Sequence, residues 1–204
     1  KLTILFGKFL GIIMFLTFSK NYKIAKKNLT IAFPHLSKNE INNLLKKTFK
    51  HYGVISIDFF RQKKFNLDEI VLELDVNTKD ILSNKKGMIL LASHFGNWEM
   101  FLPIVNLTRK ISAIVRTQKN LGGDKFISEL RTFKNVTLIS NNSSLTDMLH
   151  PLLNSEILLI LNDQRPKKSG NLINFFGSPS LVPKGAGHFY LQSKAALTFG
   201  YCIL

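Results

Sequence analysis

The stretch that decides the fold is Met88-Ile89-Leu90-Leu91-Ala92, followed directly by Ser93-His94-Phe95-Gly96-Asn97-Trp98-Glu99. A short apolar run that ends at turn-forming residues is typical of a strand buried on both faces. The polar residues after it, with Gly96 among them, indicate a turn, and residues 97–108 are expected to form a helix. The stretch therefore predicts one strand–turn–helix unit of an α/β fold.

The same alternation continues along the rest of the chain. Four further apolar runs are expected to form strands, at residues 111–115, 136–139, 157–161 and 172–176. Helices are expected between or after them, at residues 97–108, 122–134, 142–154 and 185–194. Strands this apolar need cover on both faces of their sheet. We therefore predict an α/β fold with a mixed, mostly parallel central sheet flanked by helices.

The N-terminal segment is almost uncharged. Between Leu2 and Ser19 the only charged residue is Lys8, and a basic cluster follows at once, formed by Lys20, Lys23, Lys26 and Lys27. As a helix this segment would be about 27 Å long, slightly short of a hydrocarbon core of roughly 30 Å. An apolar helix with a basic flank predicts a membrane anchor or an interfacial helix. A buried core helix and a cleaved signal peptide are the alternatives.

Residues 20–86 are expected to form a basic, amphipathic helical segment. Ser37 with Glu40 three residues later is the pattern of a capping box, which starts a helix. The sequence thus divides into an anchor at 1–19, this helical segment, and an α/β core at 87–204. Because the chain begins without Met and stops inside an apolar run, we also expect it to be a fragment whose core is incomplete at the C-terminus.

Charge and cysteine content limit the possible partners and sites. Among 204 residues there are 28 Lys and Arg against 13 Asp and Glu, a net charge of +15. Such an excess favours an anionic membrane surface, nucleic acid, or acidic proteins and phosphorylated substrates. Disorder is excluded because 45% of the residues are hydrophobic. Cys202 is the single cysteine, which excludes an internal disulfide and a metal site built from several cysteines.

The most specific candidate chemistry belongs to His94 and Glu99, because active sites of α/β sheets lie at the carboxyl ends of strands. On a straight helix, residues five apart are separated by about 140°, so these side chains can meet only if the turn around Gly96 bends the chain. In that geometry Glu99 would orient the imidazole, and the other ring nitrogen would accept a proton from a hydroxyl.

Two other kinds of site are disfavoured by the same stretch. A zinc site would need a third ligand from His150 or His188, and neither stands at a helpful spacing. A nucleophilic Ser93 would need the flanking glycines of a nucleophile elbow, which the sequence lacks. The sequence therefore predicts neither a metal nor a cofactor.

The motif from His94 to Glu99 resembles the His-x4-acid motif of the glycerolipid acyltransferases. Its residues resemble most those of the bacterial lipid A biosynthesis (lauroyl/myristoyl-type) acyltransferase family. Further blocks resemble that family in the same order: Asn28-Leu29, Ala32-Phe33-Pro34, Leu36-Ser37, Glu40, Ile114-Val115-Arg116, Glu129-Leu130-Arg131, Asp163-Gln164, Phe175-Phe176-Gly177, and Pro183 with Gly185. The resemblance covers nearly the whole chain, and several ordered blocks are far more specific than one short motif.

The resemblance implies transfer of a fatty acyl chain from an acyl carrier protein thioester to a hydroxyl of a lipid A precursor. It makes His94 the general base and Glu99 its orienting partner, and it gives Arg131, Arg116 and Asp163 roles in substrate binding or oxyanion stabilisation. The implied partners are the acyl carrier protein, an anionic glycolipid and a membrane surface, without nucleic acid. The implied location is the bacterial inner membrane, with the catalytic domain on the cytoplasmic side.

Two rival hypotheses remain open at the level of sequence. The acceptor could be another membrane lipid, such as a phosphatidylinositol mannoside, an ornithine lipid or a lysophospholipid. In a different class, the chain would be a non-catalytic basic module that binds a membrane surface or nucleic acid. An enzyme needs His94, Glu99 and Arg131 to converge on one cleft, whereas a binding module leaves them scattered.

Overall fold

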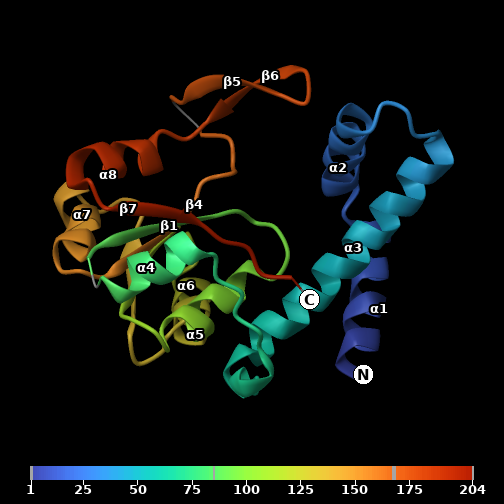
Figure 1. Ribbon diagram of the computed structural model, residues 1–204. Helices are drawn as coiled ribbons and strands as arrows, with labels where there is room; N and C mark the ends of the chain where they lie inside the picture. Colours follow the sequence, from blue (N-terminus) through green and yellow to red (C-terminus); the bar gives the residue numbers. More distant parts are fainter. Residues whose placement is uncertain (1, 85, 167–168, 204) are drawn as a thin grey trace. The chain divides into compact units, whose positions relative to one another are not determined.

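The computed structural model describes residues 2–84, 86–166 and 169–203 (Figure 1). Internal contacts divide the chain into two compact units. The first unit runs to Arg61 and includes Asn174–Ser178, and the second comprises Gln62–Ile173 together with the chain from Pro179 onward.

The first unit consists of α1 (Leu2–Thr17), α2 (Ser19–Ala32) and α3 (Lys38–Arg61). Helices α1 and α3 pack through glycines. A Cβ atom added at Gly7 would lie 2.6 Å from the Cα of Val54, and one added at Gly53 would lie 2.1 Å from the carbonyl oxygen of Gly7. Only glycine permits an approach this close, because any side chain would collide with the backbone of the other helix.

The start of α3 confirms the predicted capping box. The backbone N–H of Ser37 donates to Oε2 of Glu40 at 2.8 Å, and the backbone N–H of Glu40 donates to Oγ of Ser37 at 3.3 Å. These bonds satisfy backbone donors that the first turn of a helix leaves free. Helix α3 accordingly begins at Lys38.

The apolar N-terminal segment forms a shorter helix than the sequence suggested. Helix α1 ends at Thr17, and α2 begins at Ser19 after a sharp bend. In the described part of the chain no single helix is long and apolar enough to cross a membrane. Helices α1 and α2 together meet that criterion, but they are bent by 94°.

The second unit is built on a five-stranded sheet with the strand order β3-β2-β4-β1-β7. Its neighbouring pairs β3–β2, β2–β4, β4–β1 and β1–β7 are all parallel. The strands are β1 (Met88–Ala92), β2 (Ile111–Val115), β3 (Val136–Ser140), β4 (Ile157–Leu161) and β7 (Ala196–Phe199). The first four coincide with predicted strands, which confirms the α/β class.

The prediction for residues 172–176 was wrong about the sheet that they join. Strand β5 (Asn171–Phe175) pairs with β6 (Ser178–Val182) in a separate two-stranded sheet. The reason is the tight turn between them, where Phe176 and Gly177 both have positive φ, 50° and 73°. Such a turn matches the twist of an antiparallel hairpin and sends the chain straight back. Strand β7 takes the remaining place in the central sheet.

Helices cover both faces of the central sheet. On one face, Leu90 and Leu159 pack in a cluster with Phe101 of α5 (Phe101–Val105) and with α4 (Val76–Ser83). On the other face, Leu158 packs in a cluster with Phe189 of α8 (Gly185–Ser193) and with α7 (Leu145–Leu153). The remaining elements are α6 (Leu121–Leu130) and the short 3-10 helices η1 (Gln62–Lys64), η2 (Leu67–Glu69) and η3 (Trp98–Met100). Because helices cover both faces of the sheet, we expect the chemistry at the carboxyl ends of its strands.

Candidate active site

The register of two neighbouring strands brings His94 and Asp163 together. Strands β1 and β4 pair in parallel with Ala92 opposite Leu161, and each site residue stands two positions beyond its strand. Nδ1 of His94 lies 2.8 Å from Oδ1 of Asp163, and the backbone N–H of His94 donates to Oδ2 at 2.9 Å. Both oxygens of this carboxylate therefore hold the histidine in place.

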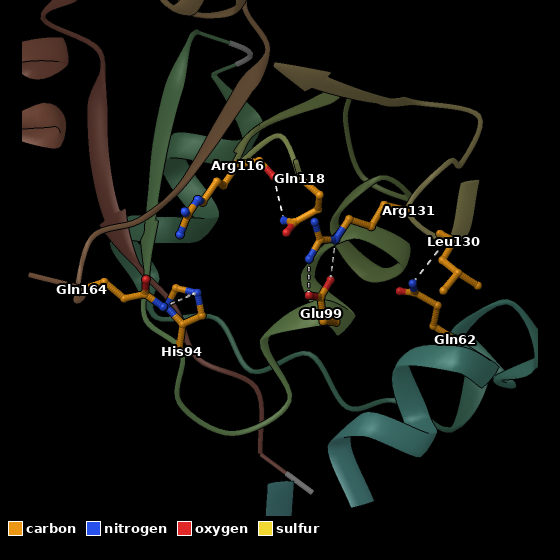
Figure 2. A network of polar contacts seen from close by, with 8 residues as sticks. All are labelled: Gln62, His94, Glu99, Arg116, Gln118, Leu130, Arg131 and Gln164. Carbon is orange, nitrogen blue, oxygen red and sulfur yellow. Dashed lines mark hydrogen bonds and ion pairs between the residues drawn. The ribbon is translucent and has the colours of Figure 1, made fainter. Parts of the chain in front are cut away.

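This contact fixes which nitrogen of His94 carries the hydrogen. Burial by itself would raise the pKa of Asp163, but hydrogen bonds from the ring and backbone of His94 outweigh it and lower the pKa. At neutral pH Asp163 is an acceptor only, so Nδ1 must carry the hydrogen and Nε2 of the neutral ring keeps a lone pair. The side-chain amide of Gln164 lies beside that ring (Figure 2).

Glu99 has a different partner from the one expected. Nε of Arg131 donates to Oε2 of Glu99 at 2.9 Å, and Nη2 donates to Oε1 at 2.5 Å. The pair is largely buried, with the side chain of Glu99 10% exposed and that of Arg131 21%. The sequence predicted that Glu99 would orient His94, whereas in the structure the carboxylate bonded to His94 is that of Asp163. Figure 2 shows Glu99 paired with Arg131 in one group and His94 beside Gln164 in another, so of the three residues expected to converge, these contacts join Glu99 and Arg131.

The turn around Gly96 explains why His94 and Glu99 reach different partners. Gly96 has a φ of +62° and forms a bridge with Cys202, and a Cβ atom there would lie 1.7 Å from the Cys202 carbonyl oxygen. That same oxygen accepts a hydrogen bond from the backbone N–H of Asn97 at 2.8 Å. The 3-10 helix η3 then starts at Trp98, whose ring packs edge-on against His94. The next residue, Glu99, is buried against Arg131.

Replacing Gly96 with alanine is expected to destabilise the protein and reduce its activity. The substitution adds a collision with the backbone at Cys202 to a left-handed conformation that costs a non-glycine residue about 1–2 kcal/mol. Urea unfolding measures the loss of stability. Gly187→Ala in α8 is the matched control, because nothing lies within 4 Å of the added Cβ and a helical alanine gains about 0.5–1 kcal/mol over glycine. Equal stability of the two variants would contradict this reading of the turn.

The end of the helix that carries Arg131 is held by two residues that the sequence did not reveal. Arg131 stands at the C-terminal end of α6, where the last carbonyl groups of a helix need donors. Nε2 of Gln62 donates to the Leu130 carbonyl at 3.1 Å, and Nζ of Lys63 donates to the Glu129 carbonyl at 2.7 Å. Gln62 is almost fully buried. No local pattern could identify it, because its partner is 68 residues away.

Arg116 lies at the carboxyl end of β2, the strand on the other side of β4. It is exposed and lines an open pocket of about 440 Å³ with Lys119 and the first turn of α6. The carbonyl of Arg116 accepts a hydrogen bond from Nε2 of Gln118 at 3.1 Å. The pocket thus offers two cationic side chains to an anionic group.

Two further observations concern the chemistry that the described residues can supply. Within the described ranges, no three or more His, Cys, Asp or Glu side chains are grouped so that they could hold a metal ion. Burial raises the pKa of the Cys202 thiol to about 11, so this thiol is protonated at neutral pH and is a poor nucleophile. His94 has a tautomer fixed by Asp163, so Nε2 of its neutral ring can take a proton from a hydroxyl.

Comparison with known proteins identifies the family of this chain. Residues 1–203 match the family described as bacterial lipid A biosynthesis acyltransferase. No individually curated protein matches the chain. Because the family match spans nearly all 204 residues, the chain belongs to this family and is an acyltransferase of lipid A biosynthesis.

Proposed function

We propose that this lipid A biosynthesis acyltransferase moves a fatty acyl chain from an acyl carrier protein thioester to a hydroxyl of a lipid A precursor, with His94 as the general base. The observation that carries the proposal is the 2.8 Å contact between His94 and Asp163 at the ends of two parallel strands. Asp163 replaces Glu99 as the residue that orients the imidazole. In the neutral ring, Nδ1 then carries the hydrogen and Nε2 keeps its lone pair before substrate binds.

The reaction follows from this protonation state. The acceptor hydroxyl donates its proton to Nε2 of His94 as its oxygen attacks the thioester carbonyl carbon, and the carbonyl electron pair moves onto the oxygen. When the C=O bond re-forms, the C–S bond breaks and the thiolate takes the proton from His94. Asp163 stabilises the imidazolium that exists between these two transfers. No covalent enzyme intermediate is needed.

The cationic side chains serve the anionic parts of the two substrates. Arg116 and Lys119 present positive charge in the open pocket, which suits a phosphate of the acceptor lipid. Glu99 fixes the position of Arg131 through two hydrogen bonds and neutralises its charge, so Arg131 acts as a positioned hydrogen-bond donor. The net charge of +15 favours the acidic carrier protein and an anionic lipid surface as partners.

We further propose that the first unit anchors the protein at the inner membrane, with the catalytic unit on the cytoplasmic side. Helix α1 turns large apolar side chains outward, with Leu2 82% exposed and Leu16 73% exposed. Basic residues of α2 follow directly, where anionic headgroups would neutralise them. Flotation with phosphatidylglycerol vesicles tests this: the protein should float with the lipid, and Leu5→Glu in α1 should weaken flotation. Equal flotation of both would contradict insertion of α1.

Acyl transfer itself is tested with the protein in detergent. An acyl carrier protein thioester and a tetra-acylated lipid A precursor are supplied, and mass spectrometry detects the lipid that has gained one acyl chain. We expect this product with the wild type and not with His94→Ala. A matched acyl-CoA reaction identifies the donor.

Each result of that experiment has a definite meaning. Transfer to a phosphatidylinositol mannoside, an ornithine lipid or a lysophospholipid, but not to the lipid A precursor, would overturn the acceptor and keep the mechanism. No transfer to any lipid would overturn the enzyme mechanism and favour a basic membrane-binding module.

A further inference from the structure

The hairpin of β5 and β6 exposes large apolar side chains to water. All five residues of β5 are exposed, and the strand pairs with β6 in a sheet of two strands. Leu172 is 69% exposed, Phe175 57% and Phe176 58%. A hairpin of two strands is only marginally stable in water, and apolar side chains gathered on a surface mark a place where a protein or a membrane binds. The hairpin is therefore a candidate binding surface.

The tip of the hairpin carries an aromatic side chain at a conformational cost. Phe176 and Gly177 form its two-residue loop, and both have positive φ, 50° and 73°. Such a loop favours Asn before Gly, because a bulky residue is strained in the left-handed region. The ring of Phe176 packs edge-to-face on that of Phe175, with 4.7 Å between the centroids. Strain of this kind gathers at functional sites, which indicates that the aromatic pair serves a partner rather than the turn.

The chain around the hairpin carries charge of one sign. From Gln164 to the end of the sequence there is no acidic residue, and there are five basic ones: Arg165, Lys167, Lys168, Lys184 and Lys194. Arg165 precedes the hairpin and Lys184 follows it, and both are exposed. Apolar side chains at the tip and cations at the base have the order in which a bilayer presents hydrocarbon and anionic headgroups. The charge therefore favours an anionic lipid surface.

A proline disfavours the addition of a strand from another protein at β6. Pro179 lies within this strand, which runs from Ser178 to Val182. Proline is tolerated in a strand where its nitrogen faces away from the paired strand, and it then removes a donor that an added strand would need. This side of the hairpin is thus protected against pairing with another chain.

The hairpin is rooted at the edge of the sheet that holds His94 and Asp163. Strand β4 ends at Leu161, and the chain passes through Asp163 before it reaches β5. Nδ2 of Asn162 donates to the Pro183 carbonyl at 3.3 Å, so the chain that enters the hairpin is tied to the chain that leaves it. A hairpin whose tip is held in lipid would therefore tether this edge of the sheet to the surface from which a lipid acceptor comes.

We propose that the tip of the β5–β6 hairpin inserts into the headgroup boundary of an anionic bilayer, as a membrane contact separate from helix α1. The inference rests on the proposed membrane location and deepens it by naming a contact close in the chain to the candidate active site. The rings of Phe175 and Phe176 enter the apolar boundary, and the basic residues at the base meet the headgroups. An acidic carrier protein is the rival occupant, and the test separates the two.

A fluorophore near the tip measures insertion directly. Asn174→Cys is labelled with nitrobenzoxadiazole in a Cys202→Ala background, and vesicles of phosphatidylglycerol are added. We expect the emission to shift to the blue because the label leaves water, and to shift less with phosphatidylcholine vesicles. Asn154→Cys is the matched control, since Asn154 is exposed at the end of α7, where the chain leads to the opposite edge of the sheet. Its label should not respond.

Phe176→Asn separates insertion from folding. Asparagine is favoured at this position of the turn, so the variant should resist urea at least as well as the wild type. Its dissociation constant for phosphatidylglycerol vesicles should rise about tenfold, because an apolar ring is lost. Leu5→Glu is present in both proteins of this comparison, so that α1 does not mask the hairpin.

Three results would overturn the proposal. The first is a tip label that does not respond to vesicles or responds equally to both lipids, and the second is equal vesicle affinity with and without Phe176→Asn. The third is a label that responds to the acyl carrier protein and not to vesicles, which would assign the hairpin to that protein. None of these measurements needs acyl transfer. A protein that inserts its hairpin but transfers nothing therefore fails only at the proposed function.

Discussion

Replacing His94 with alanine is expected to lower kcat for acyl transfer by about 10²–10⁴-fold, the contribution of a well-positioned general base. The residual rate reflects the substrates being held together without a group to take the hydroxyl proton. The fold should survive, because the side chain is 32% exposed and its loss opens no sealed cavity. Steady-state kinetics with saturating donor and acceptor measures the effect.

Two observations decide whether His94→Ala loses activity because the general base is missing or because the protein is misfolded. Added imidazole should restore part of the activity, because it supplies a base of the same kind to the space left by the side chain. His188→Ala is the control, since His188 is an exposed histidine on α8. A His94→Ala enzyme with more than about a tenth of wild-type kcat would exclude the general-base role, because even a weak base contributes more.

Replacing Arg131 with methionine is expected to lower the free energy of unfolding by about 3 kcal/mol, the lower end of the range for breaking a buried ion pair. The cost arises because Glu99 is left with a buried charge and no counter-ion. The lower end applies because Arg131 is 21% exposed, so water can partly solvate the site. Urea unfolding followed by circular dichroism measures the change.

A double variant isolates the unpaired charge as the cause. Glu99→Leu combined with Arg131→Met removes both charges, and apolar replacement of a whole buried pair is often close to neutral. The double variant should therefore be more stable than Arg131→Met alone. Arg116→Met is the control for the loss of a cation, since Arg116 is exposed and surface substitutions usually change stability by less than about 0.5 kcal/mol. A double variant as unstable as the single one would contradict this account.

The central strands were predictable because of how apolar they are. Residues 88–92 and 157–161 are continuous apolar runs, and a strand covered by helices on both faces needs that composition. Strand β7 was not predicted, although its four residues belong to the apolar run at the end of the chain. It is the last strand in the sheet order, and its residues alternate between half-buried and exposed. An apolar run this short does not by itself distinguish a strand from part of a helix.

The candidate site was predictable only in part, for a reason of topology. The position of His94 follows from its strand, because chemistry in α/β folds gathers where strands end. Its contact with Asp163 depends on β4 lying next to β1, although β2 and β3 come between them in the sequence. Strand order results from how the crossovers pack, and no local pattern encodes it. The sequence favoured Glu99 as the partner of His94 because the two residues are only five positions apart.

The measurement that tests the account most directly compares Asp163→Asn with Glu99→Gln in the acyl-transfer assay. Both substitutions keep the shape of the side chain and remove its charge. We expect Asp163→Asn to lower kcat by about 10³–10⁴-fold, because an amide no longer enforces the tautomer that leaves Nε2 free. Glu99→Gln should act mainly on stability, through the weakened bond to Arg131. A far greater loss of kcat in Glu99→Gln than in Asp163→Asn, with both proteins folded, would show that Glu99 and not Asp163 serves the base.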